Sequence, residues 1–101
     1  MIILYLTCAD NEEATKIGKA LLEERLVACV RQSQVKSSYW WDGKTNHDDE
    51  VLLMMESKEE KFDAIKEKVT SLHSYDEFVL TAVPVLKTNP GVHKWLEDTL
   101  S

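Results

Sequence analysis

Apolar and polar positions along the chain alternate between two spacings. Residues 2–8, IILYLTC, form a continuous apolar run of β-branched and aromatic side chains, which predicts a buried strand. Residues 10–26 then place apolar side chains at helical spacing and predict an amphipathic helix. Either Asp10 or Asn11 can cap this helix, and the two glutamates that follow favour the positive end of its dipole.

The middle of the chain predicts a long hairpin. Residues 27–41 read as one strand, an Asp-Gly pair at 42–43 predicts a tight turn, and residues 44–57 return as the second strand. A strand over 27–41 would extend about 50 Å, whereas a compact domain of this size measures about 35 Å across. We therefore expect the hairpin to project beyond its own domain. The run 51–55, VLLMM, is apolar on both faces of its strand, so both faces need a cover.

The second half of the chain predicts another helix, a strand and a final short helix. A capping box from Ser57 to Glu60 predicts the start of the second helix. The run 77–85 predicts the last strand, with Pro84 near its end or at a sheet edge because proline cannot donate a ladder hydrogen bond. The final helix has Asn89 as its predicted cap, with a proline at its first position.

The resulting order is β-α-β-β-α-β followed by a terminal helix. That order is typical of the ferredoxin-like split βαβ class of α+β folds, in which two helices cover one face of a four-stranded antiparallel sheet. The 101 residues predict a single domain, 1–101. The other face of the sheet is left open.

Trp40 and Trp41 make the open face a structural problem. Adjacent side chains of a strand point to opposite faces, so these two indoles need a cover on each side of the sheet. A large exposed apolar patch favours association. We therefore predict an oligomer in which the hairpins and sheets of several copies cover both tryptophans.

Charge and composition narrow the class of protein. A net charge of −6 argues against a general nucleic-acid or anionic-membrane binder. The first residues have no basic segment typical of a secretory signal, and no apolar run is long enough to span a membrane. Two cysteines are too few for a disulfide scaffold, so we expect reduced thiols in a cytoplasmic protein.

Several segments, in this order, resemble the CutA family of divalent-cation tolerance proteins: EERLVACV, YWWDGK, DEVLLMMESKEE, LHSYDE and PVLKTNPGVHKWL. The resemblance covers nearly the whole chain. It implies a ferredoxin-like homotrimer with long hairpins that reach across neighbouring subunits. It also implies a link to divalent cations, with Cu(II) or another divalent cation as the ligand and no obligatory cofactor.

The resemblance also suggests two metal ligands. Copper contacts proposed for the family correspond here to Cys8 and His73, while Leu72 replaces a further histidine. From the residues alone, Cys8 also fits a small core residue, and His73 could cap the last carbonyls of the preceding helix. The usual His-Pro-Tyr-Glu motif reads His-Ser-Tyr-Asp at 73–76, and loss of the proline predicts a looser turn.

A second candidate site is a cleft between subunits that would bind a small anion or carboxylate. Its predicted residues are Cys29, Glu56, Lys58, Tyr75 and Trp95. The competing interpretation assigns the aromatic residues to interface packing and the charged residues to a surface ion pair.

The chain shows none of the common nucleotide-binding or hydrolase motifs. The sequence thus predicts a homotrimeric binding or regulatory protein for divalent cations rather than an enzyme. The alternative is a small-molecule sensor with the architecture of PII signalling proteins.

Overall fold

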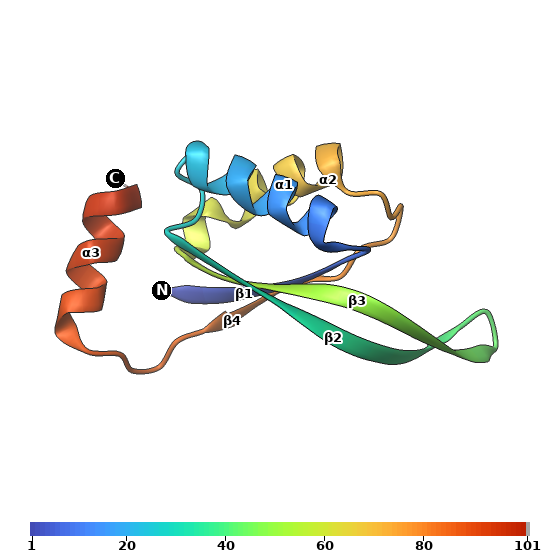
Figure 1. Ribbon diagram of the computed structural model, residues 1–101. Helices are drawn as coiled ribbons and strands as arrows, with labels where there is room; N and C mark the ends of the chain where they lie inside the picture. Colours follow the sequence, from blue (N-terminus) through green and yellow to red (C-terminus); the bar gives the residue numbers. More distant parts are fainter. Residues whose placement is uncertain (101) are drawn as a thin grey trace.

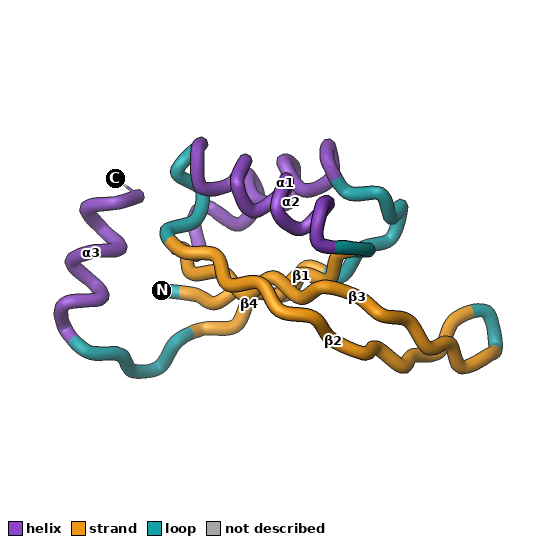
Figure 2. Tube along the Cα trace, viewed as in Figure 1, coloured by secondary structure: helices purple, strands orange, loops and turns teal. Residues whose placement is uncertain are grey.

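A four-stranded antiparallel sheet carries two helices on one face, as the sequence predicts (Figures 1 and 2). The computed structural model describes residues 1–100. The strands are β1 (Ile2–Cys8), β2 (Cys29–Trp41), β3 (Lys44–Ser57) and β4 (Leu80–Pro84), in the sheet order β2-β3-β1-β4. The helices are α1 (Asn11–Glu23), the 3-10 turn η1 (Glu59–Lys61), α2 (Phe62–Leu72) and α3 (Pro90–Leu100).

The core lies between the sheet and helices α1 and α2. Side chains of β1 alternate strictly between buried and partly buried, and the second half of β3 does the same, so each strand contributes one face to the core. The most enclosed side chains share that face or the facing stripe of a helix: Leu4, Leu6, Leu53, Met55, Ile17, Leu21, Ile65 and Val69. Leu22, the next residue along α1 after Leu21, lies off this stripe and is 42% exposed.

The β2–β3 hairpin projects beyond the rest of the sheet (Figure 1). Strand β1 pairs with β3 only from Val51 to Ser57, so the residues of β3 before Val51 pair with β2 alone. The predicted tight turn is confirmed, because both central residues have positive φ, 52° at Asp42 and 74° at Gly43. The principal extents of 45 × 27 × 21 Å reflect this projection, as the strand length predicted.

Helix α3 stands at the opposite end of the sheet from the hairpin tip (Figure 2). Lys58 Nζ lies 2.8 Å from Glu97 Oε2, and Arg25 donates to the carbonyl of Thr99 at 3.0 Å. Leu96 and Leu100 are buried, whereas Leu86 in the connection before α3 is 91% exposed. Among the described residues, no helix is long and apolar enough to cross a membrane.

Three sequence-based details were wrong, each for a local reason. Ser57 forms no capping box, because it is the buried end of β3 and its hydroxyl donates to the carbonyl of Leu26 at 2.6 Å. The first helix ends at Glu23 rather than residue 26, since Arg25 turns the chain with a positive φ of 56°. The last strand is confined to Leu80–Pro84, where it pairs with β1 at the edge of the sheet.

Candidate metal-binding site

Three segments of the chain meet beside the core: the end of β1, the first turn of α1 and the turn that follows α2. Cys8 is the last residue of β1, Glu13 lies in the first turn of α1, and His73 is the C-cap of α2. One potential ligand atom from each of the three lies within 4.8 Å of the others. The structure therefore brings the predicted pair Cys8 and His73 together and adds Glu13.

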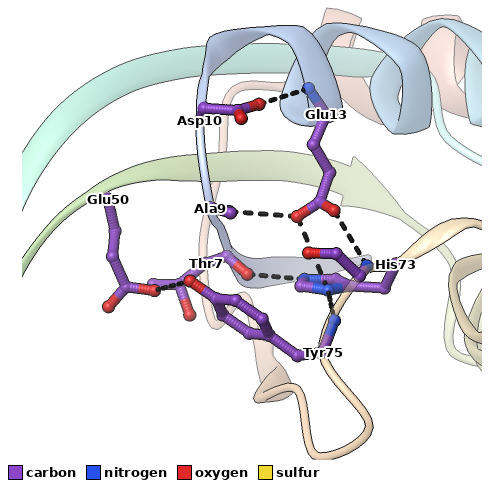
Figure 3. A network of polar contacts seen from close by, with 8 residues as sticks. Thr7, Ala9, Asp10, Glu13, Glu50, His73 and Tyr75 are labelled. Atoms are coloured by element: carbon purple, nitrogen blue, oxygen red, sulfur yellow. Dashed lines mark hydrogen bonds and ion pairs between the residues drawn. The ribbon is translucent and has the colours of Figure 1, made fainter.

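Helix α1 begins with a cap that also positions Glu13. Asp10 is extended, with φ −157° and ψ 177°, and its carboxylate accepts the Glu13 backbone N–H at 2.9 Å. In return, Glu13 Oε1 accepts the N–H of Ala9 at 3.0 Å (Figure 3). This exchange resembles a capping box displaced by one residue, and it turns the Glu13 carboxylate away from solvent toward β1.

The Glu13 carboxylate also holds the turn after α2. Its Oε2 accepts the Ser74 N–H at 2.8 Å, and its Oε1 lies 3.6 Å from His73 Nδ1. Burial by itself raises the pKa of Glu13, but the hydrogen bonds from Ser74 and Ala9, helped by His73, outweigh it and lower the pKa below its ordinary value. The serine that was expected to loosen this turn thus supplies a backbone N–H that proline could not donate.

The His73 ring is fully enclosed and has a partner at each nitrogen. Nε2 lies 2.8 Å from the carbonyl oxygen of Thr7, and Nδ1 lies 3.0 Å from the backbone nitrogen of Tyr75. Because a carbonyl only accepts and an amide N–H only donates, the proton belongs on Nε2 and the lone pair on Nδ1. The sequence allowed the His73 ring to cap the last carbonyls of α2, but the ring bonds Thr7 and it is the His73 backbone N–H that donates to the carbonyl of Val69.

Cys8 is a buried thiol within this polar group. Burial, followed by the nearby carboxylates of Glu13, Asp10 and Glu50, raises the pKa of the Cys8 thiol to about 12. At neutral pH the side chain is therefore protonated and packs as a small core residue. A metal ion would have to displace this proton, since the thiolate is the form that ligates metals.

The donor set suits a borderline or soft divalent cation. Thiolate sulfur, imidazole nitrogen and carboxylate oxygen are the usual ligands of Zn²⁺, and imidazole and sulfur also bind copper. Three protein donors leave a fourth position for water or another group. The residues present therefore fit a cation. Before they could ligate it, Cys8 would have to lose its thiol proton and His73 Nδ1 would have to give up the hydrogen bond from the Tyr75 N–H.

Tyr75 links this site to the hairpin. Its hydroxyl donates to Glu50 Oε2 at 3.0 Å, and its ring centroid lies 4.8 Å from that of His73 (Figure 3). Burial and the Glu50 carboxylate raise the pKa of Tyr75 well above its ordinary value, so the hydroxyl keeps its proton. Sequence reasoning missed Glu50, because an acidic residue in a strand carries no sign of its partner.

The five residues of the predicted cleft lie in two places within one chain. Cys29 pairs with Glu56 across the hairpin, and Arg31 forms an ion pair with Glu56 that the sequence did not indicate. Lys58 forms an ion pair with Glu97 of α3, whereas the competing interpretation paired it with Glu56. Trp95, on the same helix as Glu97, is 40% exposed. Tyr75 bonds Glu50, which lies six residues, or about 20 Å, along β3 from Glu56. The predicted cleft lies between subunits and would need residues of two chains, so it stays a prediction.

The class of fold is the ferredoxin-like α+β sandwich with an extended hairpin. The chain belongs to the CutA1 family, whose model, described as CutA1 divalent ion tolerance protein, matches residues 2–99. A relative from Pyrococcus horikoshii, named divalent-cation tolerance protein CutA, is 39% identical over 100 residues. The alignment covers 98% of this chain and 98% of the relative.

Solved structures agree with this assignment along the whole chain. The periplasmic divalent cation tolerance protein CutA from Archaeoglobus fulgidus superposes with a TM-score of 0.96 at 32% identity, covering 100% of both chains. The divalent cation tolerance protein from Thermus thermophilus gives a TM-score of 0.95 at 34% identity, again covering 100% of both chains. The CutA resemblance is confirmed, and so is the ferredoxin-like fold.

A first prediction concerns the fastening role of Glu13. Glu13→Gln should lower the free energy of unfolding at pH 7 by about 1–3 kcal/mol. The carboxylate accepts two backbone N–H groups, whereas the amide NH₂ of glutamine is a donor and would leave one of them without its acceptor. The Glu13 pKa is lowered in the folded state, so its stabilisation is present above the unfolded pKa of about 4.3 and is lost as pH falls through the folded pKa. The difference between wild type and variant should therefore shrink below about pH 4.

Urea unfolding at matched protein concentrations measures this difference. Glu12→Gln is the control, because Glu12 lies in the same turn with an exposed side chain, and the change there should stay within about 0.5 kcal/mol. A Glu13→Gln difference that stays constant from pH 7 to pH 3 would contradict the role assigned to this carboxylate.

Proposed function

We propose that this protein binds a divalent cation through Cys8, Glu13 and His73 and acts as a binding or regulatory module rather than as an enzyme. The observation that carries the proposal is the convergence of a sulfur, an oxygen and a nitrogen donor from three separate segments within 4.8 Å. The names of the relatives, which refer to divalent-cation tolerance, support the same ligand class. The mixed donor set favours Cu(II) or Zn(II) over Mg²⁺ or Ca²⁺, which prefer oxygen alone.

We further propose that the working unit is a homotrimer. Trp40 and Trp41 are 75% and 62% exposed in the single chain, and the face of the sheet away from the helices is only partly covered. Exposed indoles on a projecting strand favour association with another surface. A second and third copy would provide it, because the hairpin is long enough to leave its own domain and reach a neighbour.

The small-molecule alternative ranks second. It needs a neighbouring chain to bring Tyr75 close to Glu56, Lys58 and Trp95, since the fold of one chain separates them.

We propose the cytoplasm as the compartment of this protein, because both cysteines are free thiols and such thiols persist in reducing surroundings. Two relatives carry the words periplasmic and chloroplastic in their names, so cell fractionation decides this point.

Metal titration tests the proposed site. Wild-type protein, stripped of metal and kept under argon, should bind Zn(II) and Cu(II) with modest affinity in a calorimeter. Cys8→Ser should weaken binding at least about tenfold, because loss of a direct ligand costs no less than loss of a supporting group. Cys29→Ser is the matched control, since Cys29 is the other free thiol and lies outside the donor group. Equal affinities for the two variants would contradict the assignment of Cys8.

Light scattering tests the proposed assembly. The wild-type protein should have three times the mass of the 11.6 kDa chain at micromolar concentration. Replacing both Trp40 and Trp41 by alanine should shift the mass toward the single chain, because the indoles supply much of the buried apolar area. Leu22→Ala, which removes an exposed apolar side chain from α1, should leave the mass unchanged. A wild-type protein with the mass of one chain would refute the trimer.

A further inference from the structure

The His73 side chain offers one lone pair, and that lone pair is already in use. Nε2 carries the ring proton and donates it to Thr7, so only Nδ1 can ligate a metal, and Nδ1 accepts the Tyr75 N–H at 3.0 Å. A carboxylate oxygen can accept a hydrogen bond and bind a cation together, but an imidazole nitrogen cannot do both. A cation on Nδ1 and the Tyr75 hydrogen bond therefore exclude each other.

The turn that would lose this bond is fastened mainly through the same group of residues. The Ser74 N–H donates to Glu13, the Tyr75 N–H donates to His73, and the Tyr75 hydroxyl donates to Glu50. Ser74 and the two residues after Tyr75 are exposed, and no helix or strand includes them. Loss of the Tyr75 N–H bond thus removes a principal backbone restraint from the segment 73–76.

We propose that a bound cation takes the lone pair of His73 from the Tyr75 amide, opens the turn 73–76 and releases the Tyr75 hydroxyl from Glu50. The inference rests on the proposed cation site and adds a response to it. The turn is a latch, closed by a hydrogen bond to the atom that would serve as the metal ligand. Binding and latch opening are then a single exchange, in which one partner of Nδ1 replaces the other.

Glu50 carries the response to the base of the hairpin. Glu50 is 9% exposed and lines a groove of about 650 Å³ between the start of α1 and the hairpin, together with Asp10, Lys36 and Asp49. When Tyr75 leaves, the Glu50 carboxylate loses its hydroxyl donor and becomes free for other partners in this groove. Occupancy of a buried site is thereby transmitted to the surface where the hairpin leaves the domain.

Amide hydrogen exchange measured by NMR tests the latch directly. With saturating Zn(II), which is diamagnetic and does not oxidise thiols, the Tyr75 amide should exchange at least about tenfold faster than in the metal-free protein. The His73 amide is the internal control, because it donates to Val69 and not to the site, and its exchange should change little. Saturable Zn(II) binding with unchanged Tyr75 exchange would overturn the latch and leave the proposed cation site intact.

Two tyrosine variants separate a latch from a direct ligand. Tyr75→Phe removes the bond to Glu50 but keeps the backbone N–H, so the closed turn is weaker and Zn(II) affinity should rise about three- to tenfold. Tyr39→Phe is the matched control, since it removes a tyrosine–carboxylate bond to Asp48 near the hairpin tip, and affinity should stay constant. Weaker binding by Tyr75→Phe would overturn the latch, and absence of Zn(II) binding by the wild type would overturn the cation site and the latch together.

Discussion

The carboxylate of Glu13 is the interaction on which this side of the molecule depends. Its two oxygens accept N–H groups from Ala9, at the end of β1, and from Ser74, after α2. It therefore joins the first turn of α1 to the end of β1 and to the turn that follows α2. Because a buried carboxylate needs such donors, the same bonds that fasten the turns also keep Glu13 ionised.

The candidate site follows from this fastening. The Glu13 carboxylate that accepts the Ser74 N–H also lies beside His73, and the His73 ring is oriented by Thr7 and Tyr75. Cys8 then comes within reach simply because it ends the strand that Thr7 belongs to. The donor group is therefore a by-product of structural hydrogen bonds, and a cation at the proposed site would have to compete with those bonds. That competition is why modest affinity and a coupled response are expected together.

Sequence reasoning predicted the framework because each element had a clear local pattern. Periodicity placed the strands and helices, and the Asp-Gly pair at 42–43 identified a turn that needs positive φ at both positions. The hairpin length was predictable from residue count alone. The capping box at Ser57 was not, because burial of its hydroxyl against Leu26 depends on how the sheet meets a distant loop.

Two of the three donors of the candidate site were predicted. Cys8 and His73 came from the family resemblance, whereas Glu13 was interpreted only as an acid favoured by the helix dipole. The Asp10-x-x-Glu13 spacing could have indicated a side chain that reaches back, as it does to Ala9. Its contact with Ser74, 61 positions away, depends on tertiary packing and left no pattern in the sequence.

X-ray absorption spectroscopy of the protein loaded with one Zn(II) per chain tests the central claim most directly, because it reports the donor atoms themselves. Coordination by Cys8, Glu13 and His73 predicts one sulfur at about 2.3 Å and nitrogen or oxygen ligands at about 2.0–2.2 Å. The sulfur contribution should vanish in Cys8→Ser and persist in Cys29→Ser. A wild-type spectrum described by nitrogen and oxygen ligands alone would contradict the account.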